Sequence, residues 1–254
     1  MSEEEKTVLY EKIGKVAVIT LNRPEKLNAL NAKMNKDMKE ALKEGKDDPE
    51  IRSIVFTGAG RGFCSGSDVS EFASKVLPEA LITPYDFIDI PKPIIAAVNG
   101  VAVGFGMNVT INCDIIIASE EASFGEFFIR MGLVPDMNGS LWLPLMLGPH
   151  KAKELIFTGE RISAQEALRI GLVNKVVPAD QLMDTAMELA NELAERPPLA
   201  IQMSKKLLHE GFRKIFDEML QKEVQYQAKM YTTKDHMEAV MAFLQKRKPV
   251  FKGK

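Results

Sequence analysis

The amino-acid sequence predicts an α/β protein, in which helices cover both faces of a parallel sheet. Residues 53–57, 94–98 and 115–118 are short, continuous apolar segments, as expected of strands buried on both faces. These segments alternate with amphipathic ones, of which residues 31–45 are the clearest. This alternation is typical of a mainly parallel sheet with helices packed against it.

The N-terminal elements follow from turn and cap residues. Strands are expected at residues 8–10 and 16–21, before Asn22-Arg23-Pro24 interrupts the pattern. A helix is expected next, with Asn31 as its N-cap and Gly45 as its end. Its buried face consists of apolar residues three or four positions apart: Leu30, Met34, Met38 and Leu42.

The second half of the chain is expected to be mainly helical. Ser163 with Glu166 is a capping-box pattern, and Gly171 is a natural helix end. Further helices are expected at residues 182–193, 200–209, 215–230 and 236–247. We therefore interpret residues 1–195 as an α/β core and residues 196–254 as a helical C-terminal region.

Composition excludes several classes of protein. The chain has 254 residues, 46% of them hydrophobic, and its 33 Lys and Arg against 35 Asp and Glu give a net charge of -2. This balance argues against nucleic-acid binding. Cys64 and Cys113 are too few for a disulfide framework and lack the spacing of metal ligands. The acidic N-terminus and the short apolar runs predict a cytoplasmic protein without a membrane segment or metal.

Two glycine-containing segments follow buried strands, at residues 62–69 and 99–108. Glycine permits a sharp turn, and the amides at a helix start can point at an anion. Two such segments could supply two N–H donors to one developing oxyanion. Each segment, taken alone, is more often an ordinary strand-to-helix turn.

Motifs over nearly the whole chain occur together in one order. They are Leu21-Asn22-Arg23-Pro24, Asn28-Ala29-Leu30, Phe63-Cys64-Ser65-Gly66-Ser67-Asp68-Val69, Pro91 to Gly100 with Ala102-Val103-Gly104, Cys113-Asp114-Ile115, Ala122-Ser123-Phe124-Gly125, Thr158-Gly159, Gly171-Leu172-Val173 and Phe243 to Pro249. In this set and order the sequence resembles the enoyl-CoA hydratase/isomerase (crotonase) superfamily.

The resemblance implies a core of ββα repeats and an acyl-CoA thioester as ligand. Coenzyme A then arrives as part of the substrate, and no other cofactor is expected. It also implies a homotrimer or a dimer of trimers, with the helices from residue 200 onward making the trimer contact. The apolar residues expected in that contact are Leu207, Leu208, Phe212 and Phe216.

Catalytic roles also come from the resemblance. In the family, two backbone amides hold the thioester oxygen, and the matching residues are Ser65 and Phe105. The two glutamates of the hydratase branch match Asn108 and Phe128, neither of which is acidic. Asp136 matches the catalytic acid of peroxisomal-type Δ3,Δ2-enoyl-CoA isomerases. The chain is therefore expected to shift the double bond of 3-enoyl-CoA to 2-enoyl-CoA, with Asp136 carrying the proton.

Several alternatives stay open. Asp136 could be a helix cap, since Pro-Asp before a helix is common. Glu126 is a rival acid or a residue facing the ribose or solvent. The chain could instead be a hydratase that uses Asp136 or Glu126, a dehalogenase- or thioesterase-type enzyme, or an acyl-CoA-binding protein without catalysis.

The substrate contacts are likewise carried over by position. Arg23, Lys26, Ala29 and Leu30 would lie near the nucleotide of CoA. The remaining expected contacts with CoA or the acyl group are Phe63, Gly66, Ser67, Asp68, Val69, Gly104, Asn108 and Phe128. Phe243 and Lys246 would contact CoA of the same or a neighbouring subunit.

Overall fold

The structure, a computed structural model, describes residues 6–70 and 81–254, which leaves most of the acidic N-terminal segment outside the described residues. A six-stranded sheet forms its centre, in the order β1-β2-β3-β5-β7-β10. Only β1 is antiparallel to its neighbour. The strands are β1 (Val8–Ile13), β2 (Val16–Leu21), β3 (Ser53–Gly58), β5 (Ile94–Val98), β7 (Ile115–Ser119) and β10 (Lys175–Val177). The predicted α/β class is confirmed.

A second, smaller sheet has the order β4-β6-β8-β9. Its strands are β4 (Gly62–Cys64), β6 (Val101–Val103), β8 (Ser123–Gly125) and β9 (Ile162–Ser163). The first three are parallel, with Gly62 opposite Val101 and Val103 opposite Gly125. The carboxyl ends of parallel strands meet at one edge, so the residues that follow β4, β6 and β8 emerge side by side.

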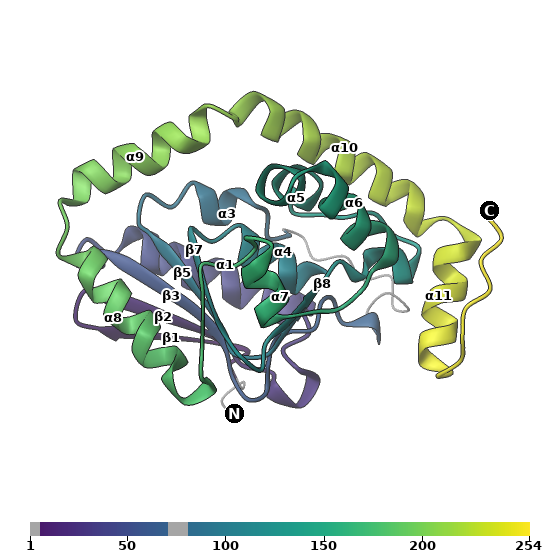
Figure 1. Ribbon diagram of the computed structural model, residues 1–254, viewed down its shortest axis with the longest axis horizontal. Helices are drawn as coiled ribbons and strands as arrows, with labels where there is room; N and C mark the ends of the chain where they lie inside the picture. The colour runs from purple at the N-terminus through teal and green to yellow at the C-terminus, as the bar shows by residue number, and fades with distance from the viewer. Residues whose placement is uncertain (1–5, 71–80) are drawn as a thin grey trace.

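Helices cover both faces of the large sheet (Figure 1). The helices of the described residues are α1 (Ala32–Asp47), α3 (Tyr85–Ile88), α4 (Phe105–Ile111), α5 (Gly139–Leu147), α6 (Pro149–Thr158), α7 (Ala164–Arg169), α8 (Leu182–Ala194), α9 (Pro198–Glu210), α10 (Arg213–Tyr231) and α11 (Lys234–Leu244), with 3-10 turns η1 (Pro24–Lys26), η2 (Phe127–Met131) and η3 (Ala179–Gln181). On one face, α8 buries Leu182, Ala186 and Ala190 against β2, β3, β5 and β7, because a spacing of four residues places them in one stripe. The larger core lies on the other face.

The cap predictions are confirmed, but one helix end was wrong. The Asn31 side chain accepts from the amide of Met34 at 2.8 Å, and the Ser163 hydroxyl accepts from the amide of Glu166 at 3.2 Å. Gly45 does not end its helix. It lies inside α1, where a side chain would be only 3.1 Å from the Cδ1 atom of Ile54, so close packing on β3 explains this glycine.

In Figure 1, α9 and α10 arch over the core and α11 lies at the far end of the arch. Leu207 and Leu208 on α9 are 70% and 71% exposed, as the expected trimer contact requires. Phe216 does not belong to that contact: it is 2% exposed and packs against Trp142 and Tyr85 of its own chain. The trimer and the division at residue 195 stay predictions. No helix among the described residues is long and apolar enough to cross a membrane.

Candidate active site

Two backbone turns meet at the carboxyl edge of the small sheet. Gly66 follows β4 with a φ of 97°, and Gly104 follows β6 with a φ of 54°, which side chains rarely adopt. The turns are pressed together: a Cβ on Gly106 would lie 2.1 Å from the carbonyl oxygen of Cys64. Only glycine therefore allows α4 to start against the residues that follow β4.

Several amides of these turns lack hydrogen-bond partners among the described residues. One is the amide of Phe105, at the start of α4, where helical amides lack intrahelical acceptors. The predicted partner, the Ser65 amide, is not free, because it donates to the carbonyl oxygen of Leu27 at 3.0 Å. The prediction of Ser65 as an oxyanion donor was wrong; in the first turn the amides of Gly66 and Ser67 have no acceptor among the described residues, and that of Ser67 is the candidate donor.

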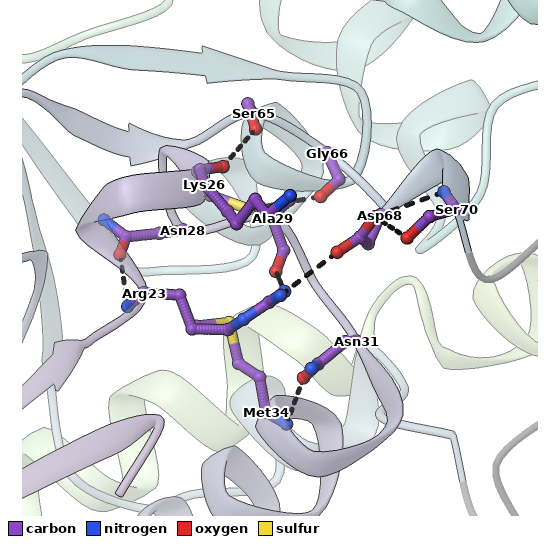
Figure 2. A network of polar contacts seen from close by, with 11 residues as sticks. Arg23, Lys26, Asn28, Ala29, Asn31, Met34, Ser65, Gly66, Asp68 and Ser70 are labelled. Carbon is purple, nitrogen blue, oxygen red and sulfur yellow. Dashed lines mark hydrogen bonds and ion pairs between the residues drawn. The ribbon is translucent and has the colours of Figure 1, made fainter. Parts of the chain in front are cut away.

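Residues 23–30 hold the first turn in place (Figure 2). The guanidinium of Arg23 donates to the carbonyl oxygen of Ala29 at 2.6 Å and pairs with the carboxylate of Asp68 at 3.1 Å. The amide of Leu30 donates to the carbonyl oxygen of Gly66, and the amide of Asp68 donates to that of Leu30, each at 2.8 Å. The motif that suggested CoA contacts thus also fixes the turn that presents the Ser67 amide.

The other predicted contacts differ in their exposure. The ring of Phe63 is fully buried in the core, 6.0 Å from the ring of Phe56, and its contact with a ligand stays a prediction. Lys26 is exposed beside the Arg23 network. Phe243 and Lys246 are exposed at the end of α11, and their contact with CoA stays a prediction.

A carboxylate turn lies beside the amide turns. Asn108 is one helical turn after Phe105 on α4, and its fully buried side chain donates to the carbonyl oxygen of Asp136 at 2.9 Å. Gly139 packs against the same side chain, since a Cβ there would lie 2.6 Å from it. The buried ring of Phe128 lies near Gly104, 3.9 Å from the position of a Cβ on that glycine. The structure thus brings together Asp136 and the α4 start.

Side chains of α10 hold this turn from outside. The carboxylate of Glu223 accepts from the amide of Asn138 at 2.7 Å, from the amide of Ser140 at 3.0 Å and from the hydroxyl of Ser140. Gln227 accepts from the amide of Val134 at 3.1 Å. Residues on both sides of Asp136 are therefore anchored to a helix more than 80 positions later in the sequence.

Three carboxyl groups interact electrostatically here. Burial and, to a smaller extent, the negative charge of Glu223 raise the pKa of Asp136 to about 7, while the Asn108 amide acts in the opposite direction. Burial also raises the pKa of Glu126 well above its usual value, and Asp136 and Glu223 add to this effect. Desolvation likewise raises the pKa of Glu223. An Asp with a pKa near neutrality can take up and release a proton at physiological pH.

Sequence reasoning missed three contributors to the site: the Ser67 amide, Glu223 and Gln227. Whether the Ser67 amide is free depends on the hydrogen bonds of the neighbouring backbone, which cannot be predicted from residue type. Glu223 and Gln227 had a signal, because they lie 7 and 11 residues after Phe216 and thus on its buried helix face. Polar side chains in an apolar stripe indicate a buried partner. Among the described residues, no group of three or more His, Cys, Asp or Glu could hold a metal ion.

Comparison with known proteins places this geometry in a family. A family model described as enoyl-CoA hydratase/isomerase matches residues 11–254. A short-chain-enoyl-CoA hydratase from Clostridium acetobutylicum is 40% identical over 251 residues, 95% of each chain. A carnitinyl-CoA dehydratase from Salmonella agona is 40% identical over 256 residues, 95% of this chain and 96% of the relative.

The solved structures agree with this similarity. An enoyl-CoA hydratase/isomerase from Pseudoalteromonas atlantica superposes with a TM-score of 0.92 at 31% identity, covering 97% of this chain and 100% of the other. The two sequence relatives carry the names of hydratases or dehydratases, and neither is named an isomerase. These names therefore do not support the expectation that the chain belongs to the isomerase branch of the family.

Proposed function

The chain belongs to the enoyl-CoA hydratase/isomerase (crotonase) superfamily, whose members here include hydratases and a dehydratase of CoA thioesters, and from this premise we propose that it converts 3-enoyl-CoA to 2-enoyl-CoA. The observation that carries the proposal is Asp136, a carboxyl group with a pKa of about 7 beside the start of α4. A group of this kind can accept a proton from carbon and return it.

The reaction needs no oxidant, metal or second acid. The carboxylate of Asp136 takes the proton from C2, and the electron pair of that C–H bond moves onto the thioester oxygen. The free amides of Ser67 and Phe105 hold the enolate oxygen, because fixed donors stabilise developing charge without reorganising. Asp136 then gives the proton to C4, so that the double bond ends between C2 and C3 and one carboxyl group serves both transfers.

The residues at the two hydratase positions favour this reaction. Phe128 cannot transfer a proton, and Asn108 is engaged as a donor to the backbone of Asp136. Both side chains are buried: Phe128 lies near Gly104 at the start of α4, and Asn108 holds the backbone of Asp136. This environment fits the raised pKa of the base, because burial disfavours the charged carboxylate.

A second candidate is hydration of 2-enoyl-CoA or dehydration of 3-hydroxyacyl-CoA. It is favoured by the names of the relatives and by Glu126, a second buried carboxyl group that interacts with Asp136. Addition of water requires one group to take a proton from water and one to supply a proton to C2. Glu126 and Asp136 could divide these roles.

One experiment separates the candidates. The protein is incubated with 3-enoyl-, 2-enoyl- and aryl-CoA esters, and products are identified by mass and ultraviolet absorbance. Isomerisation faster than hydration supports the main proposal, whereas a hydration rate equal to or above the isomerisation rate supports the second. Release of free CoA or halide would indicate hydrolysis or dehalogenation, and binding without turnover of any ester would indicate a binding protein.

The homotrimer, the cytoplasmic location and the CoA contacts of Arg23, Lys26, Ala29 and Leu30 belong to the same proposal. Sedimentation at micromolar concentration tests the first of these. A monomer would show that the exposed leucines of α9 have another role.

A further inference from the structure

Five buried acceptor atoms on Glu126, Asn108 and the turn of Asp136 lack hydrogen-bond partners among the described residues. Four of them are both carboxyl oxygens of Glu126, the Oδ1 atom of Asp136 and the Oδ1 atom of Asn108; the fifth is the Oδ1 atom of Asn138, whose Nδ2 atom donates to the carbonyl oxygen of Phe216 on α10. The residues Glu126 and Asn108 are 0% exposed. Buried polar atoms in proteins are almost always paired, because an unpaired one forfeits its interaction with water. Four unpaired acceptors in one place therefore indicate a missing donor.

The fold places these atoms around one site. Glu126 directly follows β8, and the carbonyl oxygen of its neighbour Gly125 accepts from the amide of Gly104 at 2.8 Å. Its side chain thus starts beside the turn that presents the Phe105 amide. Burial, and then the charges of Asp136 and Glu223, raise the pKa of Glu126, in agreement with a position beside this turn. Within residues 6–70 and 81–254, neither carboxyl oxygen of Glu126 has an ion pair or a hydrogen bond, so that part of the chain supplies no charged donor to it.

The unpaired atoms define the chemistry of the ligand. A hydrocarbon chain would bury all four without a partner, which is costly. A hydroxyl group can donate to one carboxyl group and accept from the other if that one is protonated, and two carboxyl groups close together rarely ionise together. Water has the same capacity, so the donor could come from the acyl chain or from solvent.

We propose that Glu126 is a specificity-determining residue and that, together with Asp136, it binds a hydroxyl group on the acyl chain of the thioester. The inference rests on the proposed function insofar as it requires an acyl-CoA in this site. It makes hydroxylated acyl-CoA esters, rather than plain fatty acyl-CoA esters, the preferred ligands.

The test compares the binding of isosteric thioesters that have no double bond to shift. Titration calorimetry with the full chain measures 4-hydroxybutyryl-CoA against pentanoyl-CoA, and 3-hydroxybutyryl-CoA against 3-methylbutyryl-CoA. In each pair a hydroxyl replaces a methyl group. We expect the hydroxylated member of at least one pair to bind about tenfold tighter or more, as for a hydrogen bond to a charged group. Chromatography of the recovered esters checks that none was consumed.

Variants assign the preference to Glu126. Glu126→Leu should abolish or reverse it, because the apolar side chain favours the methyl group. Glu126→Gln, which keeps the shape and one acceptor, should reduce it partly. Glu160→Gln changes an exposed glutamate close to Glu126 and should leave the preference intact. Circular dichroism verifies that each variant folds. If Glu126→Leu does not fold, the result with Glu126→Gln decides the test.

Equal binding within twofold for both pairs in the wild-type protein would overturn the inference and assign the missing donor to water. A preference unchanged in Glu126→Gln and Glu126→Leu would overturn it as well. The proposed function fails in a different way, through absence of double-bond shift. The two failures are distinguishable because no ester in the binding test has a double bond to shift.

Discussion

The two sides of the site are built by different means. The amide side consists of Ser67 and Phe105, which the parallel strands β4 and β6 deliver through Gly66, Gly104 and Gly106. The carboxylate side consists of the turn that carries Asp136, which Asn108 holds from within and α10 holds from outside. Main-chain geometry defines the first side, whereas side-chain hydrogen bonds between distant segments define the second.

This difference separates binding from proton transfer. In the proposed reaction, the amide side would bind an oxygen atom that every thioester possesses, and a substitution can displace its backbone donors but cannot remove them. The carboxylate side would decide which proton moves, and its geometry and pKa depend on individual side chains of α4 and α10. Substitutions on the second side can therefore change the reaction while the amide side stays intact.

The largest expected effect comes from removing the proton carrier while leaving the amide side untouched. Asp136→Asn keeps the size of the side chain but cannot accept a proton. Isomerisation should fall by ~10²–10⁴-fold, the usual contribution of a general base. Binding of pentanoyl-CoA should change little, because it depends on the amides and the CoA contacts. Steady-state kinetics and calorimetry measure the two effects.

Asp136→Glu serves as the matched control and should retain part of the activity, because it restores a carboxyl group. If Asp136→Asn kept near-wild-type rates while Glu126→Gln were inactive, the base would be Glu126. The proton carrier would then lie directly after β8 and not in the turn before α5.

The next effect breaks the amide side instead. Gly106→Ala would place a Cβ 2.1 Å from the carbonyl oxygen of Cys64, so α4 must move away from the first turn. We expect kcat to fall by about 10²–10³-fold, the usual cost of a lost oxyanion donor, and the melting temperature to fall as well. Gly211→Ala is the control, because a Cβ at that position would make only an ordinary contact, 3.9 Å from the carbonyl oxygen of Leu207. Unchanged kcat in Gly106→Ala would contradict the assignment of the oxyanion site.

A smaller effect is expected from Glu223, which holds the carboxylate side from outside. Glu223→Gln removes a negative charge and at least one acceptor from the turn around Asp136. Displacement of the base should lower kcat by about 10–100-fold with little change in KM. The acidic limb of the pH–rate profile should move to lower pH, because the charge of Glu223 raises the pKa of Asp136.

Glu218→Gln, an exposed change on the same helix, is the control for Glu223→Gln. A loss of kcat without movement of the acidic limb would show that Glu223 acts only through the shape of the turn. Full activity would show that α10 does not position Asp136.

The same contrast explains what the sequence could predict. The strands, caps and motifs of the core are local patterns, and the α/β class and the two glycine turns followed from them. Asp136 came from the resemblance to a family, and its catalytic role stays a prediction. The donor assignment failed at Ser65, because which amides of the turn are free depends on the pairing with Leu27 and Leu30. The motif also did not reveal that the side chain of Phe63 is buried in the core.

The contacts that α10 makes with the Asp136 turn could not be predicted from the sequence for a different reason. Glu223 and Gln227 act on residues more than 80 positions away, and no local pattern encodes such a contact. Gly45 shows the same limit on a smaller scale: it resembles a helix end, but close packing on Ile54 explains it. Local rules predicted elements, whereas contacts between elements required the structure.

The smallest expected effect concerns the cost of keeping Asp136 in its place. The pKa of this carboxyl group is about 7 in the folded protein and near 3.8 without the fold, so the folded state binds the proton more tightly. Its contribution to stability is therefore fully present below about pH 4 and is lost as the pH rises through 7. Asp136→Asn removes this loss of stability at high pH, because the asparagine side chain carries no charge at any pH. Its melting temperature should exceed that of the wild type by a few degrees at pH 8, on the order of 1–2 kcal/mol for a chain of this size, and by less at pH 5. Asp180→Asn, a change at an exposed carboxylate of η3, should show no such trend. A wild-type protein at least as stable as Asp136→Asn at pH 8 would mean that the site stabilises the charged carboxylate, and the account of Asp136 as a base made available by burial would have to be abandoned.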